Sequence, residues 1–148
     1  MVKNTNNLVE LARPCLEEFD TFCKNNDLLG KVKTDHIGLK CSSKEVYELQ
    51  RSFFEFESKF MYQSIISKRR ISIVGLTQGL ETSVGPLNYV ELSDQKPDGS
   101  QKDVIDHLEV VPLTMSYEEL INYVKSKKVT LKETIKPHHT TYDIILSS

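Results

Sequence analysis

One short sequence occurs twice in this chain of 148 residues, and it constrains the fold more than any other feature. Asp-His-Ile-Gly-Leu at residues 35–39 returns as Asp-His-Leu-Glu-Val at residues 106–110, an offset of 71. From the histidine onward, polar and apolar residues alternate in both copies, which is typical of a strand with one buried face. A repeat at this distance predicts two similar units whose first strands carry histidines at matched positions. We therefore expect a pseudo-symmetric sheet with His36 and His107 in one concave cleft.

The two predicted units differ in length. The first unit, residues 35–93, has the pattern of a strand, a helix and three further strands, and Ser42 and Glu45 have the spacing of a capping box at the start of its helix. The second unit, residues 106–146, opens in the same way but shows only two strand-like runs after its helix, at 129–135 and 140–146. We therefore expect the second unit to lack the counterpart of the last strand of the first. The unpaired sheet edge that results favours a homodimer.

Helical periodicity marks two further segments. Residues 5–29 predict a helix over a core, and Pro14 should kink this helix or divide it in two. In the helix of the first unit, apolar residues recur at helical spacing and should form the buried face: Val46, Leu49, Phe53, Phe56 and Phe60. We expect an α+β protein with a single domain over residues 1–148, in which residues 1–30 form an N-terminal helical segment.

Composition excludes several classes of protein. The 19 basic and 21 acidic residues give a formal charge of -2, which argues against a nucleic-acid partner. The apolar runs are too short for a transmembrane helix, and the N-terminus lacks the apolar core of a signal peptide. Three cysteines, an odd number, predict no disulfide framework and a reducing compartment. The expected location is the cytoplasm, with no membrane partner.

Three side chains are candidate metal ligands. His36 and His107 lie on the strand faces opposite the main apolar residues, and Glu91 lies opposite Val90 and Leu92 on the last strand of the first unit. Two imidazoles and one carboxylate suit Zn²⁺, Mn²⁺, Fe²⁺, Ni²⁺ or Co²⁺ and leave open positions for water or substrate. The alternative is that each histidine is a half-buried strand residue held by hydrogen bonds.

Other polar residues near these positions have less specific signals. Glu109 lies two residues beyond His107 on the same strand face, where it is either a candidate catalytic base beside the metal or a solvated strand carboxylate. Glu109 or the Tyr89 hydroxyl could also orient the metal ligands by hydrogen bonding. His138 and His139 follow a proline, so we expect them in a turn or at a strand start rather than at the metal.

The motifs resemble those of the vicinal-oxygen-chelate superfamily, which includes glyoxalases, extradiol dioxygenases and bleomycin-resistance proteins, and within it most closely the YecM-like proteins. The likeness covers residues 8–146 and rests on Thr34-Asp35-His36, Cys41 and His107-Leu108-Glu109. The resemblance implies paired βαβββ modules that form a curved, mostly antiparallel sheet around a metal-binding cleft. It also implies that His36, Glu91 and His107 ligate the metal. The fourth ligand, which the superfamily takes from the last strand of the second module, is the one this chain lacks.

The sequence leaves three functions open. The first is a metal-dependent enzyme that acts on a small oxygenated molecule. The second is a non-catalytic protein that binds a small ligand or a metal, and the third is an interaction module with a vestigial metal site. No phosphate-binding loop, Cys-x-x-Cys or His-Glu-x-x-His motif points elsewhere. The expectation is a divalent-metal-binding protein whose small-molecule ligand the sequence does not identify.

Overall fold

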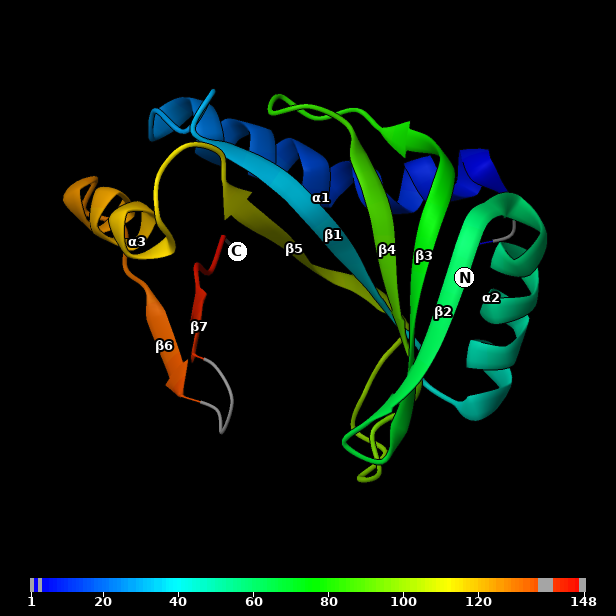
Figure 1. Cartoon of the computed structure of the whole chain (residues 1–148). Helices are drawn as coiled ribbons and strands as arrows, with labels where there is room; N and C mark the ends of the chain where they lie inside the picture. The colour runs from blue at the N-terminus through cyan, green and yellow to red at the C-terminus, as the bar shows by residue number, and fades with distance from the viewer. Residues whose placement is uncertain (1, 3, 136–139, 147–148) are drawn as a thin grey trace.

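The structure, a computed structural model, describes residues 2, 4–135 and 140–146 and has an α+β fold (Figure 1). The helices of this described part are α1 (Thr5–Asn25), α2 (Lys44–Glu57) and α3 (Tyr117–Ser126). Its strands are β1 (Val32–Lys40), β2 (Ser58–Ile66), β3 (Arg69–Leu80), β4 (Leu87–Ser93), β5 (Val104–Pro112), β6 (Lys132–Ile135) and β7 (Thr140–Asp143). The first unit, β1-α2-β2-β3-β4, therefore has the expected βαβββ order.

Five of the strands form one curved sheet in the order β2-β3-β4-β1-β5. Only the β1–β4 pair is parallel, so the sheet is mostly antiparallel, as predicted. The two strands that carry the repeated motif, β1 and β5, are antiparallel neighbours. His36 lies opposite Glu109 and Gly38 opposite His107 in their register. The prediction that the two histidine strands are sheet neighbours is confirmed.

The two faces of this sheet differ in character. Helices α1 and α2 lie on the outer side of the arch that the strands form (Figure 1). The main core is packed between these helices and the sheet; it includes Leu8, Ala12, Leu16, Tyr47 and Phe54 from the helices and Ile37, Leu39, Val90 and Leu92 from the strands. Because side chains alternate along a strand, the residues between these apolar ones face the inner side of the arch. His36 and Glu91 are among them.

The sequence predicts that Pro14 either kinks the N-terminal helix or divides it; helix α1 continues through Pro14, so the division does not occur. It ends at Asn25, four residues earlier than predicted. A proline inside a helix costs about 3 kcal/mol, but burial of Leu8, Ala12 and Leu16 against the sheet offsets that cost. None of the helices in the described chain is both long and apolar enough to cross a membrane.

The start of α2 is one residue later than the capping box predicts. The N-cap is Ser43, whose hydroxyl accepts a hydrogen bond from the backbone N–H of Val46. Ser42 instead bonds to Asp103 through both its backbone N–H and its hydroxyl, at 2.7 Å each. The predicted pattern fitted Ser42, but the neighbouring serine satisfies the free N–H groups of the first turn.

The buried face of α2 also differs from the predicted one. The buried residues are Tyr47, Gln50 and Phe54, whereas Leu49 and Phe56 are 56% and 85% exposed. Tyr47 and Gln50 carry polar groups, and they can be buried because these groups have hydrogen-bond partners. The Tyr47 hydroxyl bonds to two side chains of the neighbouring strands, and the Gln50 amide bonds to a backbone N–H and a backbone carbonyl near the N-terminus. A count of apolar residues alone does not detect this face.

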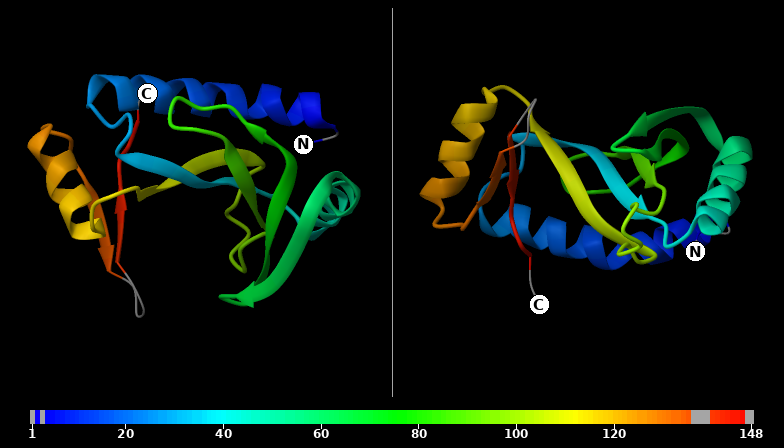
Figure 2. Two further views of the ribbon diagram at one scale, coloured as in Figure 1. Left: turned by 45° about the horizontal axis from the view of Figure 1, so that its top comes forward. Right: turned by 90° about the horizontal axis from the view of Figure 1, so that it is seen from below.

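The second unit departs from the first after its helix. Ser116 and Glu119 form the predicted capping box of α3. Among the described strands, however, β6 and β7 pair only with each other, as a separate two-stranded sheet beyond β5 (Figure 2). Leu131 and Ile144, which flank these short strands, pack against a second core with α1 and α3 rather than extending the main sheet. The second unit therefore contributes one strand to the five-stranded sheet.

Candidate metal centre

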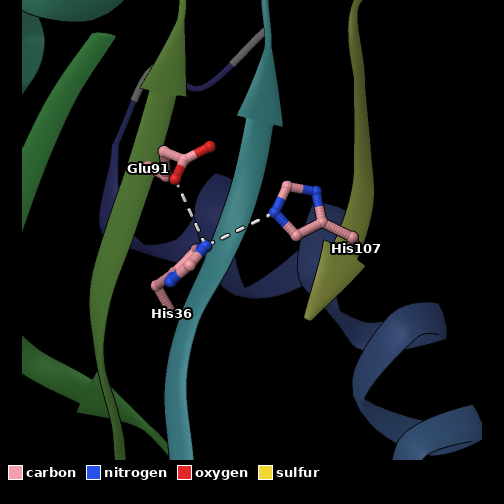
Figure 3. A group of neighbouring side chains, drawn as sticks. All are labelled: His36, Glu91 and His107. Carbon is pink, nitrogen blue, oxygen red and sulfur yellow. Dashed lines mark hydrogen bonds and ion pairs between the residues drawn. The ribbon is translucent and has the colours of Figure 1, made fainter. Parts of the chain in front are cut away.

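Side chains from three adjacent strands meet on the inner face of the sheet (Figure 3). His36 comes from β1, Glu91 from β4 and His107 from β5. The Nε2 atom of His36 lies 3.4 Å from Nε2 of His107 and 3.4 Å from a carboxylate oxygen of Glu91. One ligand atom from each residue lies within 4.8 Å of the others. These are the three residues that the sequence marks as candidate ligands.

The aspartate that precedes each histidine in the repeat contacts its ring. His36 Nδ1 lies 2.8 Å from Asp35, and His107 Nδ1 lies 2.8 Å from Asp106. When each imidazole donates its Nδ1–H to the carboxylate, each Nε2 is left as a free lone pair. The sequence contains both Asp-His pairs, but the role of the aspartates becomes visible only when the rings are placed.

In the Nδ1–H tautomer of both imidazoles, three electron-pair donors point at one another. The His36 side chain is 10% exposed, that of Glu91 26% and that of His107 37%. Lone pairs and a carboxylate brought together in a partly buried place repel one another unless a cation or a proton lies between them. The chemistry of this donor set, two imidazole nitrogens and one carboxylate oxygen, fits a divalent metal of the first transition row.

A glycine makes this approach possible. Gly38, on β1, lies beneath the His107 ring, because a methyl group placed on it would be 2.5 Å from Nδ1 and 2.8 Å from Nε2 of His107. These separations are shorter than any normal carbon–nitrogen contact. The His107 ring can reach across β1 toward His36 only because residue 38 has no side chain.

Glu109 lies on the other side of the His36 ring nitrogen. One of its carboxylate oxygens is 3.4 Å from His36 Nε2, and the side chain is 56% exposed. Asp35, His36 and Glu109 form a second set of potential ligand atoms within 4.8 Å of one another. Glu109 can thus accept a proton or a hydrogen bond beside the three convergent groups.

The electrostatics of Asp106 reflect its contact with the site. Burial by itself would raise the pKa of this carboxyl. The hydrogen bond from His107, with the nearby positive charge of Lys40, outweighs burial and lowers the pKa of Asp106 below its ordinary value. Asp106 is therefore held as an acceptor for the His107 ring.

Other residues singled out by the sequence lie as follows. Both histidines occupy the interior of their strands and not the strand starts, and the β1–β4 and β1–β5 ladders hold these strands in place. Tyr89 shares the face of Glu91, and its ring lies 6.0 Å from that of Phe60. Cys41 is buried. His138 and His139 lie outside the described residues.

A cavity of about 410 Å³ adjoins the site beyond β5. It lies between α1, α3 and β7, and its lining includes His107 and Glu109 as well as apolar residues of the second core. The β5 residues in this lining belong to the edge strand of the five-stranded sheet, next to β1, which carries His36.

Comparisons with known proteins agree with the resemblance seen in the motifs. The family described as "YecM protein" matches residues 12–145 of the chain. A solved structure from structural genomics, Protein EC4020, superimposes with a TM-score of 0.60 at 18% sequence identity, and the alignment covers 90% of this chain and 82% of that one. No curated protein matches the chain. The structural likeness shows the fold, because the identity is low.

Proposed function

The chain belongs to the YecM family, and we propose that it binds one divalent metal ion through His36, Glu91 and His107 and presents this ion to a small oxygen-bearing molecule. The proposal is of the vicinal-oxygen-chelate type, in which a metal on the inner face of a curved sheet keeps positions open for a ligand. The βαβββ order of the first unit and the position of all three ligands on adjacent strands support it.

The observation that carries the proposal is the spacing of the donor atoms. Two ligands about 2.0–2.1 Å from a tetrahedral zinc ion are about 3.3–3.4 Å apart. The His36–His107 and His36–Glu91 separations are both 3.4 Å. This agreement makes Zn²⁺ the first metal to test, followed by Mn²⁺ and Ni²⁺, which accept the same nitrogen and oxygen ligands.

The roles of the protein side chains follow from their contacts. Asp35 and Asp106 hold the imidazoles by their Nδ1 atoms, so that both Nε2 atoms remain available. A metal bound there would supply Lewis acidity to a carbonyl or hydroxyl oxygen of the ligand. Glu109, 3.4 Å from His36 Nε2, is placed to accept a proton from such a ligand. If Glu109 serves only as a solvated carboxylate, the protein is a binder and not an enzyme.

The test is calorimetric titration of metal-free protein with Zn²⁺, Mn²⁺ and Ni²⁺. The wild type should bind one ion, and His36→Ala, His107→Ala and Glu91→Gln should each abolish stoichiometric binding while the circular dichroism spectrum stays unchanged. The matched control is Glu17→Gln, the same carboxylate-to-amide change on an exposed position of α1. Equal binding by the wild type and all three site variants, or no binding by any of them, would rule out this metal site.

A further inference from the structure

Three partly exposed aromatic rings occupy the inner face of the sheet beside the candidate metal centre. Phe60 and Tyr62 lie on β2 and Tyr89 lies on β4; their exposed fractions are 40%, 69% and 40%. The ring centroids of Phe60 and Tyr62 are 5.5 Å apart, and those of Phe60 and Tyr89 are 6.0 Å apart. A group of rings in contact and open on one side is the usual composition of a binding surface.

The strand register places this aromatic group, hereafter the ring surface, directly next to the metal ligands. Tyr89 precedes Glu91 by two residues and therefore shares its face, at a distance of about 6.6 Å along the strand. Because Val90 pairs with Ile37, Tyr89 also lies alongside His36 on the adjacent strand, about 4.8 Å away between backbones. The ring surface and the ligand atoms thus form one continuous area.

A second glycine shapes the ring surface as Gly38 shapes the metal centre. Gly75 on β3 pairs with Phe60 on one side and Tyr89 on the other. A methyl group on Gly75 would lie 2.5 Å from Cε1 and 2.8 Å from Cζ of the Phe60 ring. The missing side chain therefore lets the Phe60 ring lie over β3 and approach Tyr89.

We propose that Phe60, Tyr62 and Tyr89 form a ring-binding subsite, and that the metal centre acts on small molecules that carry an aromatic ring next to the ligating oxygen. This proposal rests on the proposed function and adds the substrate class to it. Offset or edge-to-face contacts between the ligand ring and these side chains provide the recognition.

The dimensions limit the distance between the ring and the oxygen. A ligand that stacks on Tyr89 while its oxygen reaches the space between His36, Glu91 and His107 must span about 5–7 Å. This distance suits a ring joined to its oxygen donor through about three bonds, as in a hydroxamate. A long aliphatic chain would extend past the ring surface, and its natural place would be the apolar cavity beyond β5, whose lining includes His107.

The test uses three hydroxamates that share one chelating group and differ in what is attached to it. Acetohydroxamate carries a methyl group, cyclohexanecarbohydroxamate a saturated ring and benzohydroxamate an aromatic ring. Their dissociation constants are measured on zinc-loaded wild-type protein by displacement titration and, for reference, on free Zn²⁺. The ratio of the two dissociation constants on the protein is divided by the same ratio on free Zn²⁺, which removes the difference in chelation. After this correction, we expect benzohydroxamate to bind about two- to tenfold more tightly than the cyclohexyl compound.

Phe60→Leu and Tyr62→Leu then separate the ring surface from the metal. In each variant, the ratio of the dissociation constants of benzohydroxamate and the cyclohexyl compound should equal the ratio measured on free Zn²⁺. The dissociation constant of acetohydroxamate should stay at its wild-type value. Unchanged ratios in both variants, or a wild-type ratio equal to that of free Zn²⁺, would overturn the ring-binding subsite and leave the metal site standing. If the wild type binds no zinc and none of the hydroxamates, the proposed function itself fails. A wild-type dimer that becomes monomeric in both variants would mean that a second copy covers the rings, and the subsite would be rejected.

Discussion

Replacing Gly38 by alanine tests whether the convergence of the two histidines is what binds the metal. The added methyl group would lie 2.5 Å from Nδ1 and 2.8 Å from Nε2 of His107, so the imidazole must move off β1. The ligand residues themselves stay in place in the sequence, and only the position of one ring changes. The substitution therefore separates the presence of the ligands from their geometry.

The expected loss of zinc affinity follows from the displacement of the His107 imidazole from its position over β1. Disturbing the groups that orient a metal ligand usually weakens binding about 10- to 100-fold. We expect the dissociation constant of Gly38→Ala for Zn²⁺ to rise within that range. The backbone of residue 38 has no left-handed φ angle, so alanine is not strained there, and replacing glycine in a strand gains about 0.5–1 kcal/mol. The metal-free variant should thus unfold at the same urea concentration as the wild type or slightly higher.

The assay combines zinc titration with urea unfolding of the metal-free protein. Gly75→Ala is the matched control, because it introduces the same methyl group on the same face of the sheet, against Phe60 instead of His107. It should retain wild-type zinc affinity. Wild-type zinc affinity in Gly38→Ala would refute the reasoning, since the metal would then not depend on the close approach of His107 to His36.

Four further outcomes follow from the structure. Asp106→Asn should weaken zinc binding about tenfold without lowering the thermal midpoint, because His107 loses the charged acceptor at its Nδ1; unchanged affinity in the titration would contradict this. Burial raises the pKa of Cys23 and Cys41 to about 12, so neither thiol should react with Ellman's reagent at pH 8 until urea is added. Because these thiols ionise near pH 9.0 when unfolded, the free energy of unfolding should fall as pH rises from 9 toward 12, which urea titrations at pH 8 and pH 10 can measure. Phe54→Ala should destabilise the fold by about 3–5 kcal/mol, since Phe54 is 1% exposed in the main core, and a loss below 1 kcal/mol in urea would contradict that packing.

The sequence was most informative where the alternation of polar and apolar residues determined both the secondary structure and the buried face. The alternation around His36 and Glu91 set both the strand and the face, because the opposite face had to hold Ile37 and Val90 in the core. The repeat then required the two histidine strands to be equivalent, and they are neighbours in the sheet. The convergence of the three candidate ligand groups on one face of the sheet could therefore be predicted without knowledge of the loops.

The burial of polar side chains by long-range hydrogen bonds could not be predicted from the sequence. The buried face of α2 includes Tyr47 and Gln50 because hydrogen bonds with distant parts of the chain compensate their polar groups. Residues that form such bonds are separated by 25 and 48 positions, so no local pattern reveals them. The approach of the His107 ring to Gly38 likewise depends on the register of β1 and β5, which the sequence does not specify.

The pairing of β1 has a consequence for the order of folding. Strands β2, β3 and β4 are joined in sequence as an antiparallel meander, so their contacts are local and can form early. Strand β1 must instead close one chain loop to reach β4 and a longer one to reach β5, and these closures are entropically slow. The three candidate ligands can come together only after both closures. A metal ion bound there should therefore slow unfolding and leave the rate of folding almost unchanged.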